Sequence, residues 1–145
     1  MSGRIVLDTN VISAALRGDW PDSAQEWFSH TRRHHVITVV TLMELVYGIE
    51  RMPVGSRRTD LLEMIIPLVS DDGINVLEFS AAAAMAAGAL RSAREARGRA
   101  LGQADAQIAG ICSVHGATLA TRNVRDFEGL GLELVNPWEL PTAHG

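Results

Sequence analysis

Four acidic residues, far apart in the sequence, fall where a folded chain could bring them together. Asp8 directly follows the apolar run Ile5-Val6-Leu7, Glu44 follows a run of β-branched residues, and Asp126 follows a third apolar run. Asp105 begins the helical pattern that precedes that third run. Open parallel sheets bind ligands outside the carboxyl ends of their strands, and a helix that joins two such strands starts over the same edge. We therefore expect the four carboxylates to meet at one edge of a sheet.

Such a cluster favours a divalent cation and phosphoryl chemistry. Two carboxylates about 4 Å apart repel by roughly 4 kcal/mol at an effective dielectric constant near 20, so a tight cluster needs a positive charge. Oxygen ligands without Cys or His suit hard cations, which predicts Mg²⁺ or Mn²⁺ rather than zinc. A cation of this kind can activate a water and neutralise charge on a phosphate.

Each acid taken singly also fits a local structural role. Asp8 fits a helix N-cap, Glu44 fits the glutamate of a capping box that Thr41 begins, and Asp105 fits a first-turn acid that the helix dipole favours. Independent capping residues have no reason to share one edge of a sheet. Their joint placement therefore favours a common site.

The elements that must position these acids follow from hydrophobic periodicity and from turn residues. We expect strands at residues 5–7, 36–40, 74–77, 117–120 and 132–135, and helices after residues 10 and 21, from 41 to 52, from 56 to 69, from 81 to about 97 and from 103 to 115, with a loop at 121–131. Short apolar runs that alternate with helices predict an α/β sandwich with a mainly parallel central sheet.

Composition limits the possible partners and location. The 145 residues are enough for one domain, and 13 basic against 17 acidic residues argue against a protein held on nucleic acid by bulk charge. A nuclease whose bound cations offset its acidity is still compatible with that balance. The single cysteine, Cys112, is expected to be a buried thiol in a reducing cytoplasm. No stretch predicts a signal peptide or a membrane span.

Four ordered motifs resemble one known family. These motifs are Ile5-Val6-Leu7-Asp8-Thr9-Asn10-Val11, Thr41-Leu42-Met43-Glu44-Leu45 with Gly48, Asp105-Ala106-Gln107-Ile108-Ala109, and Leu119-Ala120-Thr121-Arg122-Asn123 with Asp126-Phe127, and the chain closes with Asn136-Pro137-Trp138. Together they resemble a PIN domain, and more narrowly the VapC/FitB-type toxins of bacterial toxin–antitoxin pairs. The resemblance implies a three-layer α/β/α sandwich, with a single PIN-like nuclease domain over residues 1–140 and a short tail at 141–145.

The same resemblance implies an activity and its ligands. The protein would be a Mg²⁺- or Mn²⁺-dependent endoribonuclease that cuts cellular RNA by attack of a metal-activated water on a phosphodiester. Asp8 and Asp105 would be the principal metal ligands, Glu44 would complete the first site, and Asp126 would support a second metal or its waters. Hydrogen-bonding groups beside the carboxylates would orient them, and these would be Thr9, Thr121 and Asn123.

The implied partners are RNA and a small DNA-binding antitoxin. The cognate antitoxin would hold the toxin inactive, and operator DNA would be reached only through it. Arg122 and Arg125 flank the acidic edge and are expected to contact RNA phosphates. Apolar surplus at residues 81–90 and around Tyr47 fits a homodimer patch or an antitoxin groove. No membrane partner is expected.

Other features leave alternatives open. Arg91, Arg94 and Arg97 form a helical stripe that fits either an RNA backbone contact or a solvated face, and His34 and His35 are predicted at the surface. A phosphotransfer receiver would also place acids at strand ends, but that class needs a lysine and this chain has none. The remaining alternative is a catalytically silent PIN-fold protein that binds an antitoxin and, through it, operator DNA.

Overall fold

The computed structural model describes residues 3–69 and 76–140. The strands are β1 (Ile5–Leu7), β2 (His35–Thr38), β3 (Val76–Leu77), β4 (Thr118–Ala120) and β5 (Glu133–Val135). The helices are α1 (Thr9–Arg17), α2 (Asp22–Thr31), α3 (Val39–Glu50), α4 (Ser56–Ile65), α5 (Ala81–Ala96), α6 (Gln103–His115) and the short α7 (Val124–Phe127), with 3-10 turns at Arg32–His34 and Ile66–Val69. No helix in these two ranges is long and apolar enough to cross a membrane. The predicted tail at 141–145 and the start of the predicted strand at 74–77 lie outside the described residues.

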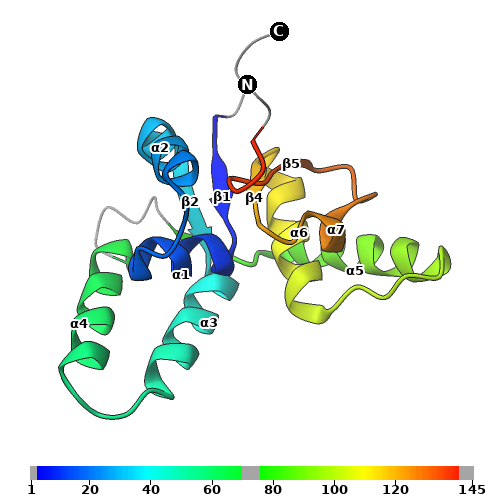
Figure 1. The fold of residues 1–145 in the computed structure, drawn as a ribbon. Coiled ribbons are helices and arrows are strands. Elements are labelled where there is room, and N and C mark those ends of the chain that lie inside the picture. The colour runs from blue at the N-terminus through cyan, green and yellow to red at the C-terminus, as the bar shows by residue number, and fades with distance from the viewer. Residues whose placement is uncertain (1–2, 70–75, 141–145) are drawn as a thin grey trace, which may run out of the picture.

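The strands form one parallel sheet in the order β3-β2-β1-β4-β5. The chain lays down β1, β2 and β3 toward one edge, then returns to the other side of β1 for β4 and β5 (Figure 1). The strand order therefore reverses between β1 and β4, and such a switch point is where open α/β sheets bind ligands. The predicted α/β class with a mainly parallel sheet is confirmed.

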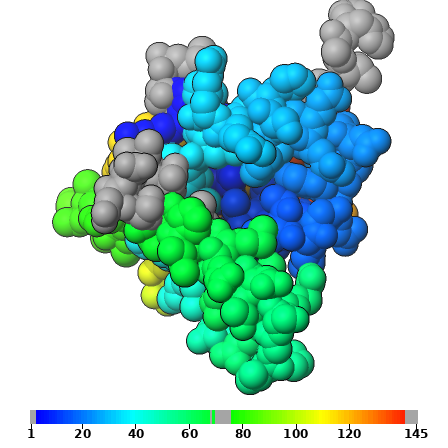
Figure 2. All heavy atoms as spheres, turned by 90° about the vertical axis from the view of Figure 1, so that its left-hand side faces the viewer, coloured from blue at the N-terminus to red at the C-terminus, as the bar shows by residue number. Residues whose placement is uncertain are grey.

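The period of two along each strand divides the core into two clusters. Val6, Val36 and Leu119 face a cluster built with α5 and α6, whereas the next residue of each strand faces a second cluster with α1, α3 and α4. Figure 1 shows the resulting layers, with α1 to α4 on one side of the sheet and α5 to α7 on the other. On the α2 and α4 side the surface is hollowed between these helices, and dark-blue atoms of the N-terminal segment lie at the floor of the hollow (Figure 2).

Helices α5 and α6 pack closely because α6 carries a glycine at the contact. A Cβ atom built on Gly110 would lie 2.4 Å from the Ala83 carbonyl oxygen and 2.9 Å from the Ala87 Cβ. Any larger residue would separate the two helices. This contact sets the position of α6 and hence of Asp105 in its first turn.

The second strand is shorter than predicted, and the predicted capping box is wrong. The Thr38 hydroxyl accepts a hydrogen bond from the Thr41 backbone N–H at 3.1 Å, so Thr38 is the N-cap and α3 begins at Val39. The β-branched Val39 and Val40 enter the helix because Val40 packs in the core, and packing outweighs their strand propensity. Glu44 consequently lies in the second turn of α3.

His35 is not the surface residue that was predicted. Its ring contacts two aromatic rings, 4.4 Å from the Phe28 centroid and 5.7 Å from the Trp27 centroid, and its Nε2 is 2.7 Å from the Thr31 hydroxyl. The pKa of His35 is lowered to about 4, mainly by burial and also by the charges of Arg32 and His34. His35 is therefore a neutral part of the packing between α2 and β2.

The one cysteine behaves as predicted. Cys112 is fully buried in the cluster against α5, and burial raises the pKa of its thiol to about 12. A thiol with so high a pKa is an inert core group at neutral pH.

Candidate active site

Asp8 is the most restrained of the four predicted acids. It follows β1 at the switch point, caps α1 and is 6% exposed. Its carboxylate accepts hydrogen bonds from the Thr9 backbone N–H at 2.8 Å, the Thr121 hydroxyl at 2.8 Å and the Asn10 amide at 3.3 Å. Burial raises the pKa of Asp8, the bonds from Thr121 and Thr9 act against that rise, and the charge of Glu44 adds to it.

Thr121 joins the ends of two neighbouring strands. It is fully buried after β4, donates to Asp8 and accepts a hydrogen bond from the Asn123 backbone N–H at 3.0 Å. The placement beside Asp8 agrees with the orienting role expected of Thr121. Asn123 makes its bonds here through its backbone, because its carbonyl in turn accepts from the Asp126 N–H.

Asn10 is a site residue that the sequence interpretation did not assign. Its amide donates to the Asp8 carboxylate, and its side-chain oxygen accepts from the Arg122 backbone N–H at 3.0 Å. The position two residues after Asp8, at the start of a helix, was the available signal. Asn10 therefore ties α1 to the loop after β4.

Glu44 approaches from α3 on the other side of β1. Its Oε1 accepts a hydrogen bond from the Thr9 hydroxyl at 2.5 Å, which holds the carboxylate toward the start of α1. Thr9 thus contacts both acids, through its N–H to Asp8 and its hydroxyl to Glu44. This placement agrees with the orienting role expected of Thr9.

The charges of the three other acids all affect the pKa of Asp105. The pKa of Asp105 is raised to about 6: burial contributes most, the charges of Asp8, Asp126 and Glu44 add to the rise in that order, and the charge of Arg94 acts against it. A carboxyl group feels such charges only over short distances, so the four acids share one region. Asp8 and Glu44 meet at Thr9, and the charges of both, with that of Asp126, act on Asp105, while the common metal site stays a prediction.

Asp126 differs from the other three because it is exposed. It lies on α7, inside the predicted loop, and the buried side chain of Phe127 anchors that helix. Two arginines hold the surrounding backbone: Arg94 donates to the Glu128 carbonyl at 2.5 Å, and Arg99 donates to the Arg125 carbonyl at 2.7 Å.

The predicted arginine stripe is therefore wrong for Arg94. That side chain is 4% exposed, whereas Arg91 pairs with Glu95 on the solvated face of α5. The spacing Ala83, Ala87, Leu90, Arg94 follows the buried face of the helix and could have identified it.

The four acids are of a type that suits a hard cation, although their side chains are not arranged as a coordination shell. Among residues 3–69 and 76–140, no three His, Cys, Asp or Glu side chains are disposed to hold a metal ion as they stand. The four acids nevertheless provide only oxygen ligands in a partly buried region, which is the chemistry that Mg²⁺ and Mn²⁺ prefer. The residues therefore fit such an ion in kind.

A hollow of about 340 Å³ opens beside Asp126. Arg122, Asn123, Arg125 and Asp126 line it together with Val124, Asn136 and Glu139. The Arg122 guanidinium lies 5.0 Å from the centroid of the Trp138 ring, a cation–π contact that orients it. Both predicted phosphate contacts thus line a hollow next to an acid of the site.

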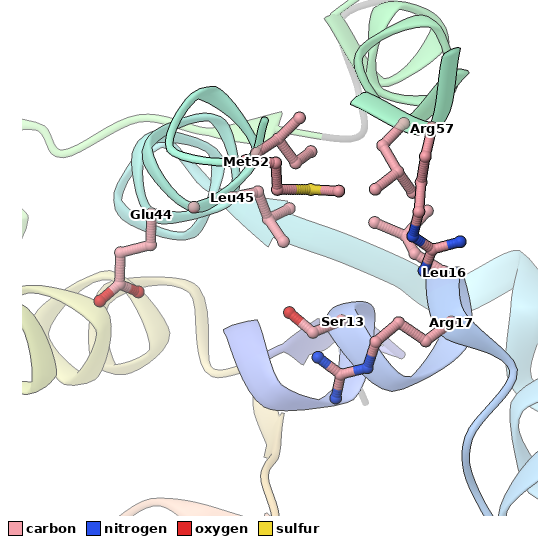
Figure 3. Close-up of a pocket in the computed structure, with 10 residues that line it drawn as sticks. Ser13, Leu16, Arg17, Glu44, Leu45, Met52 and Arg57 are labelled. Atoms are coloured by element: carbon pink, nitrogen blue, oxygen red, sulfur yellow. The ribbon is translucent and has the colours of Figure 1, made fainter. Parts of the chain in front are cut away.

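A groove of about 410 Å³ between α1, α3 and α4 leads away from Glu44. Its walls are mainly apolar, and the lining residues are Ser13, Leu16, Arg17, Glu44, Leu45, Gly48, Ile49, Met52, Arg57 and Leu61. Figure 3 shows Arg57 extending from α4 and Arg17 from α1, with the Glu44 carboxylate directed away from both. The groove thus connects an apolar surface with one acid of the site.

Comparison with known proteins identifies relatives along nearly the whole chain. The PIN domain family matches residues 5–131. The chain is 34% identical to VapC ribonuclease Y4jK of Sinorhizobium fredii over 140 residues, which covers 93% of this chain and 98% of the relative. It is 33% identical to the tRNA(fMet)-specific endonuclease VapC of Shigella flexneri, with coverage of 93% and 98%. The structure of FitAB bound to an IR36 DNA fragment matches with a TM-score of 0.85 at 27% identity, covering 97% of this chain and 99% of that one.

Proposed function

The chain belongs to the PIN-domain family of VapC/FitB-type toxins, and we propose that it is a metal-dependent endoribonuclease, the toxin of a toxin–antitoxin pair. The observation that carries this proposal is that Thr9 joins two of the acids, donating from its N–H to Asp8 and from its hydroxyl to Glu44, and that both of these acids also act on Asp105. Asp105 has its pKa raised to about 6 by burial and by the charges of Asp8, Asp126 and Glu44. The reaction is hydrolysis of RNA, in which a water adds to phosphorus and one phosphodiester P–O bond breaks.

The cation that this reaction needs is Mg²⁺ or Mn²⁺. Asp8, Glu44, Asp105 and Asp126 would hold it, since their oxygens suit a hard ion and their mutual repulsion favours a positive charge among them. When bound, such an ion activates water and stabilises the charge that develops on the phosphate.

Neighbouring polar groups orient two of the acids before substrate binds. Thr121 and Asn10 fix the Asp8 carboxylate, and Thr9 fixes the Glu44 carboxylate, so neither acid has to be ordered when substrate arrives. Without a cation, Asp105 holds a proton on its carboxyl below about pH 6. The empty site is thereby partly relieved of repulsion in mild acid.

The RNA backbone would follow the hollow beside Asp126. Arg122 and Arg125 would contact phosphates there, and the stacking of Arg122 on Trp138 restricts its guanidinium before RNA binds. Asn123 would act through the backbone bonds that link Thr121 to Asp126.

The antitoxin would occupy the groove between α1, α3 and α4. A mainly apolar groove suits an amphipathic segment that folds on binding, and Glu44 at its wall places that segment next to the site. Solved relatives include DNA-bound FitAB and DNA-bound VapBC complexes, which supports a DNA-binding antitoxin as the route to operator DNA.

We also propose that residues 1–140 of each chain form a single nuclease domain and that two chains associate as a homodimer. The proposed location is the cytoplasm. Met43, Tyr47 and Met85 are 61%, 63% and 79% exposed, and apolar groups this exposed favour a partner surface. Sedimentation at micromolar concentration should give the mass of two chains. A monomer under those conditions would leave this apolar surface without a role.

Cleavage of RNA by the purified protein tests the proposed activity. The wild type should cut RNA with Mg²⁺ or Mn²⁺ and stop when EDTA is added, whereas Asp105→Asn should not cut. Calorimetry should show divalent binding to the wild type that Asp8→Asn loses. An active Asp105→Asn variant would show that the assigned acids do not form the site, and a wild type without metal binding or cleavage would favour the catalytically silent interaction protein.

A further inference from the structure

Arg94 is a buried cation whose bond partner is a backbone carbonyl. It lies near the end of α5, is 4% exposed and donates from Nη2 to the Glu128 carbonyl oxygen at 2.5 Å. Burying a guanidinium costs free energy unless its donors are used, and an apolar side chain of similar size would avoid that cost. The position in the core therefore points to a specific task for the charged donor.

Arg99 repeats the contact from outside the core. It follows α5, is exposed and donates from Nη2 to the Arg125 carbonyl oxygen at 2.7 Å. The two bonded carbonyls, at residues 125 and 128, lie on either side of Asp126 in the sequence. Both arginines thus hold the stretch of backbone that carries one acid of the site.

A stretch of this kind needs external support. Helix α7 spans only residues 124–127, and a helix of about one turn is unstable unless tertiary contacts hold it. Phe127 anchors one side of the turn in the core, but Asp126 itself is exposed. The direction of its carboxylate therefore depends on how firmly the backbone is held.

We propose that Arg94 and Arg99 are positioning residues that clamp α7, through the Arg125 carbonyl within it and the Glu128 carbonyl directly after it, and so direct the Asp126 carboxylate into the site. The activity readout below rests on the proposed nuclease function, whereas the clamp itself does not. The electrostatics agree with this placement, because Arg94 also lowers the pKa of Asp105, which shows that its charge lies close to the site.

Hydrogen exchange tests the clamp without any reference to catalysis. Arg94→Met and Arg99→Ala should each speed amide exchange in residues 124–129 by about tenfold, the loss expected for one hydrogen bond. The matched control is Arg91→Ala, which removes an exposed arginine of the same helix that pairs with Glu95. The control should leave exchange in that segment unchanged.

Single-turnover and steady-state cleavage test the consequence for the site. Each variant should lower kcat by up to about tenfold with little change in KM, and Arg94→Met should have little further effect in an Asp126→Asn background. Wild-type exchange in the segment for both variants would overturn the clamp. A loss from Arg94→Met that fully adds to that of Asp126→Asn would overturn its action through Asp126.

The design separates the possible failures. If Arg94→Met does not fold, Arg99→Ala decides the result, because an exposed side chain can be shortened without opening the core. If the wild type cuts no RNA, the proposed nuclease function fails, and hydrogen exchange still decides whether the arginines hold α7.

Discussion

Asp8 and Asp126 are the most buried and the most exposed of the four acids, and they are positioned in opposite ways. Asp8 is 6% exposed and its carboxylate accepts three hydrogen bonds from neighbouring groups. Asp126 is exposed, and Arg94 and Arg99 contact the backbone on either side of it. One acid is restrained at its oxygens, the other through the chain that carries it.

The difference suits two different tasks. A buried carboxylate with directed bonds keeps its oxygens in place whether or not a ligand is present, as a principal metal ligand must. An exposed carboxylate on a short supported helix can adjust to a second ion, a water or the RNA. The comparison predicts that substitutions near Asp8 change both the cleavage rate and the free energy of unfolding. Substitutions near Asp126 should change mainly the cleavage rate.

The largest effect should separate the two acids. Asp8→Asn should lower kcat/KM for RNA by at least about 100-fold, because the variant loses the charge of the proposed principal metal ligand. Asp126→Asn should lower it by about 10-fold to 100-fold, as expected for a supporting group. Rate measurements on both variants in one Mn²⁺ buffer give the ratio. Equal losses of kcat/KM in the two variants would contradict the proposed difference between Asp8 and Asp126.

Gly110→Ala should disturb the α5 side of the region and leave the Asp8 side intact. The added Cβ meets the Ala83 carbonyl oxygen at 2.4 Å, so we expect about 1–3 kcal/mol lower free energy of unfolding. Denaturant titration measures the change. Gly88→Ala on α5 is the matched control, because its Cβ meets nothing within 4 Å, and it should stabilise by about 0.5–1 kcal/mol. A destabilised control would show that the close contact is not the cause.

Thr121→Val tests the direct restraint on Asp8. Valine has a similar shape but no hydroxyl, so the bonds to Asp8 and from the Asn123 N–H are both lost. Leaving buried polar groups unpaired should cost about 1–2 kcal/mol and slow cleavage by about tenfold. Thr118→Val, at the start of β4, removes a hydroxyl that donates to Glu133 at the surface and should stay within about 0.5 kcal/mol. Equal effects of the two valines would contradict a special role for Thr121.

The smallest expected effect is a pH dependence of stability in the metal-free protein. The pKa of Asp105 rises from 3.8 to about 6 on folding, so the folded state binds the proton more tightly and stability falls as pH rises across that interval. Asp105→Asn lacks this loss and should be as stable as wild type below pH 3.8 but more stable above about pH 6. Thermal melts across this range, repeated with Mn²⁺, measure it. A constant difference between the proteins at all pH values would contradict the repulsion.

Local sequence patterns predicted much of the structure that positions the four acids. The apolar run before Asp8 predicts a strand end, and the helix cap that was weighed as an alternative is also present, since Asp8 caps α1 while it faces the other acids. The limits of α6, from Gln103 to the stop at Gly116, were predicted as they occur. Each of these depends on residues within one or two turns, where propensity and capping decide.

The errors share one cause. Thr41 and Glu44 have the spacing of a capping box, yet Thr38 caps the helix because Val40 finds a place in the core. His35 was expected at the surface, but α2 folds back and covers it with aromatic rings. In both cases a neighbour supplied by the fold outweighed the local preference.

The hydrogen bonds that restrain Asp8 and the backbone around Asp126 could not be predicted from local sequence patterns. Thr121 and Asp8 are 113 residues apart, and Arg94 and Glu128 are 34 apart, so no window of the sequence contains either bond. Residue types and spacing were enough to predict the strand ends and the family and to propose the acids, because those features depend on near neighbours. Which carboxylate is buried, which arginine is internal and which hydroxyl holds Asp8 were decided when the helices docked on the sheet, since burial and hydrogen bonding are properties of the packed chain.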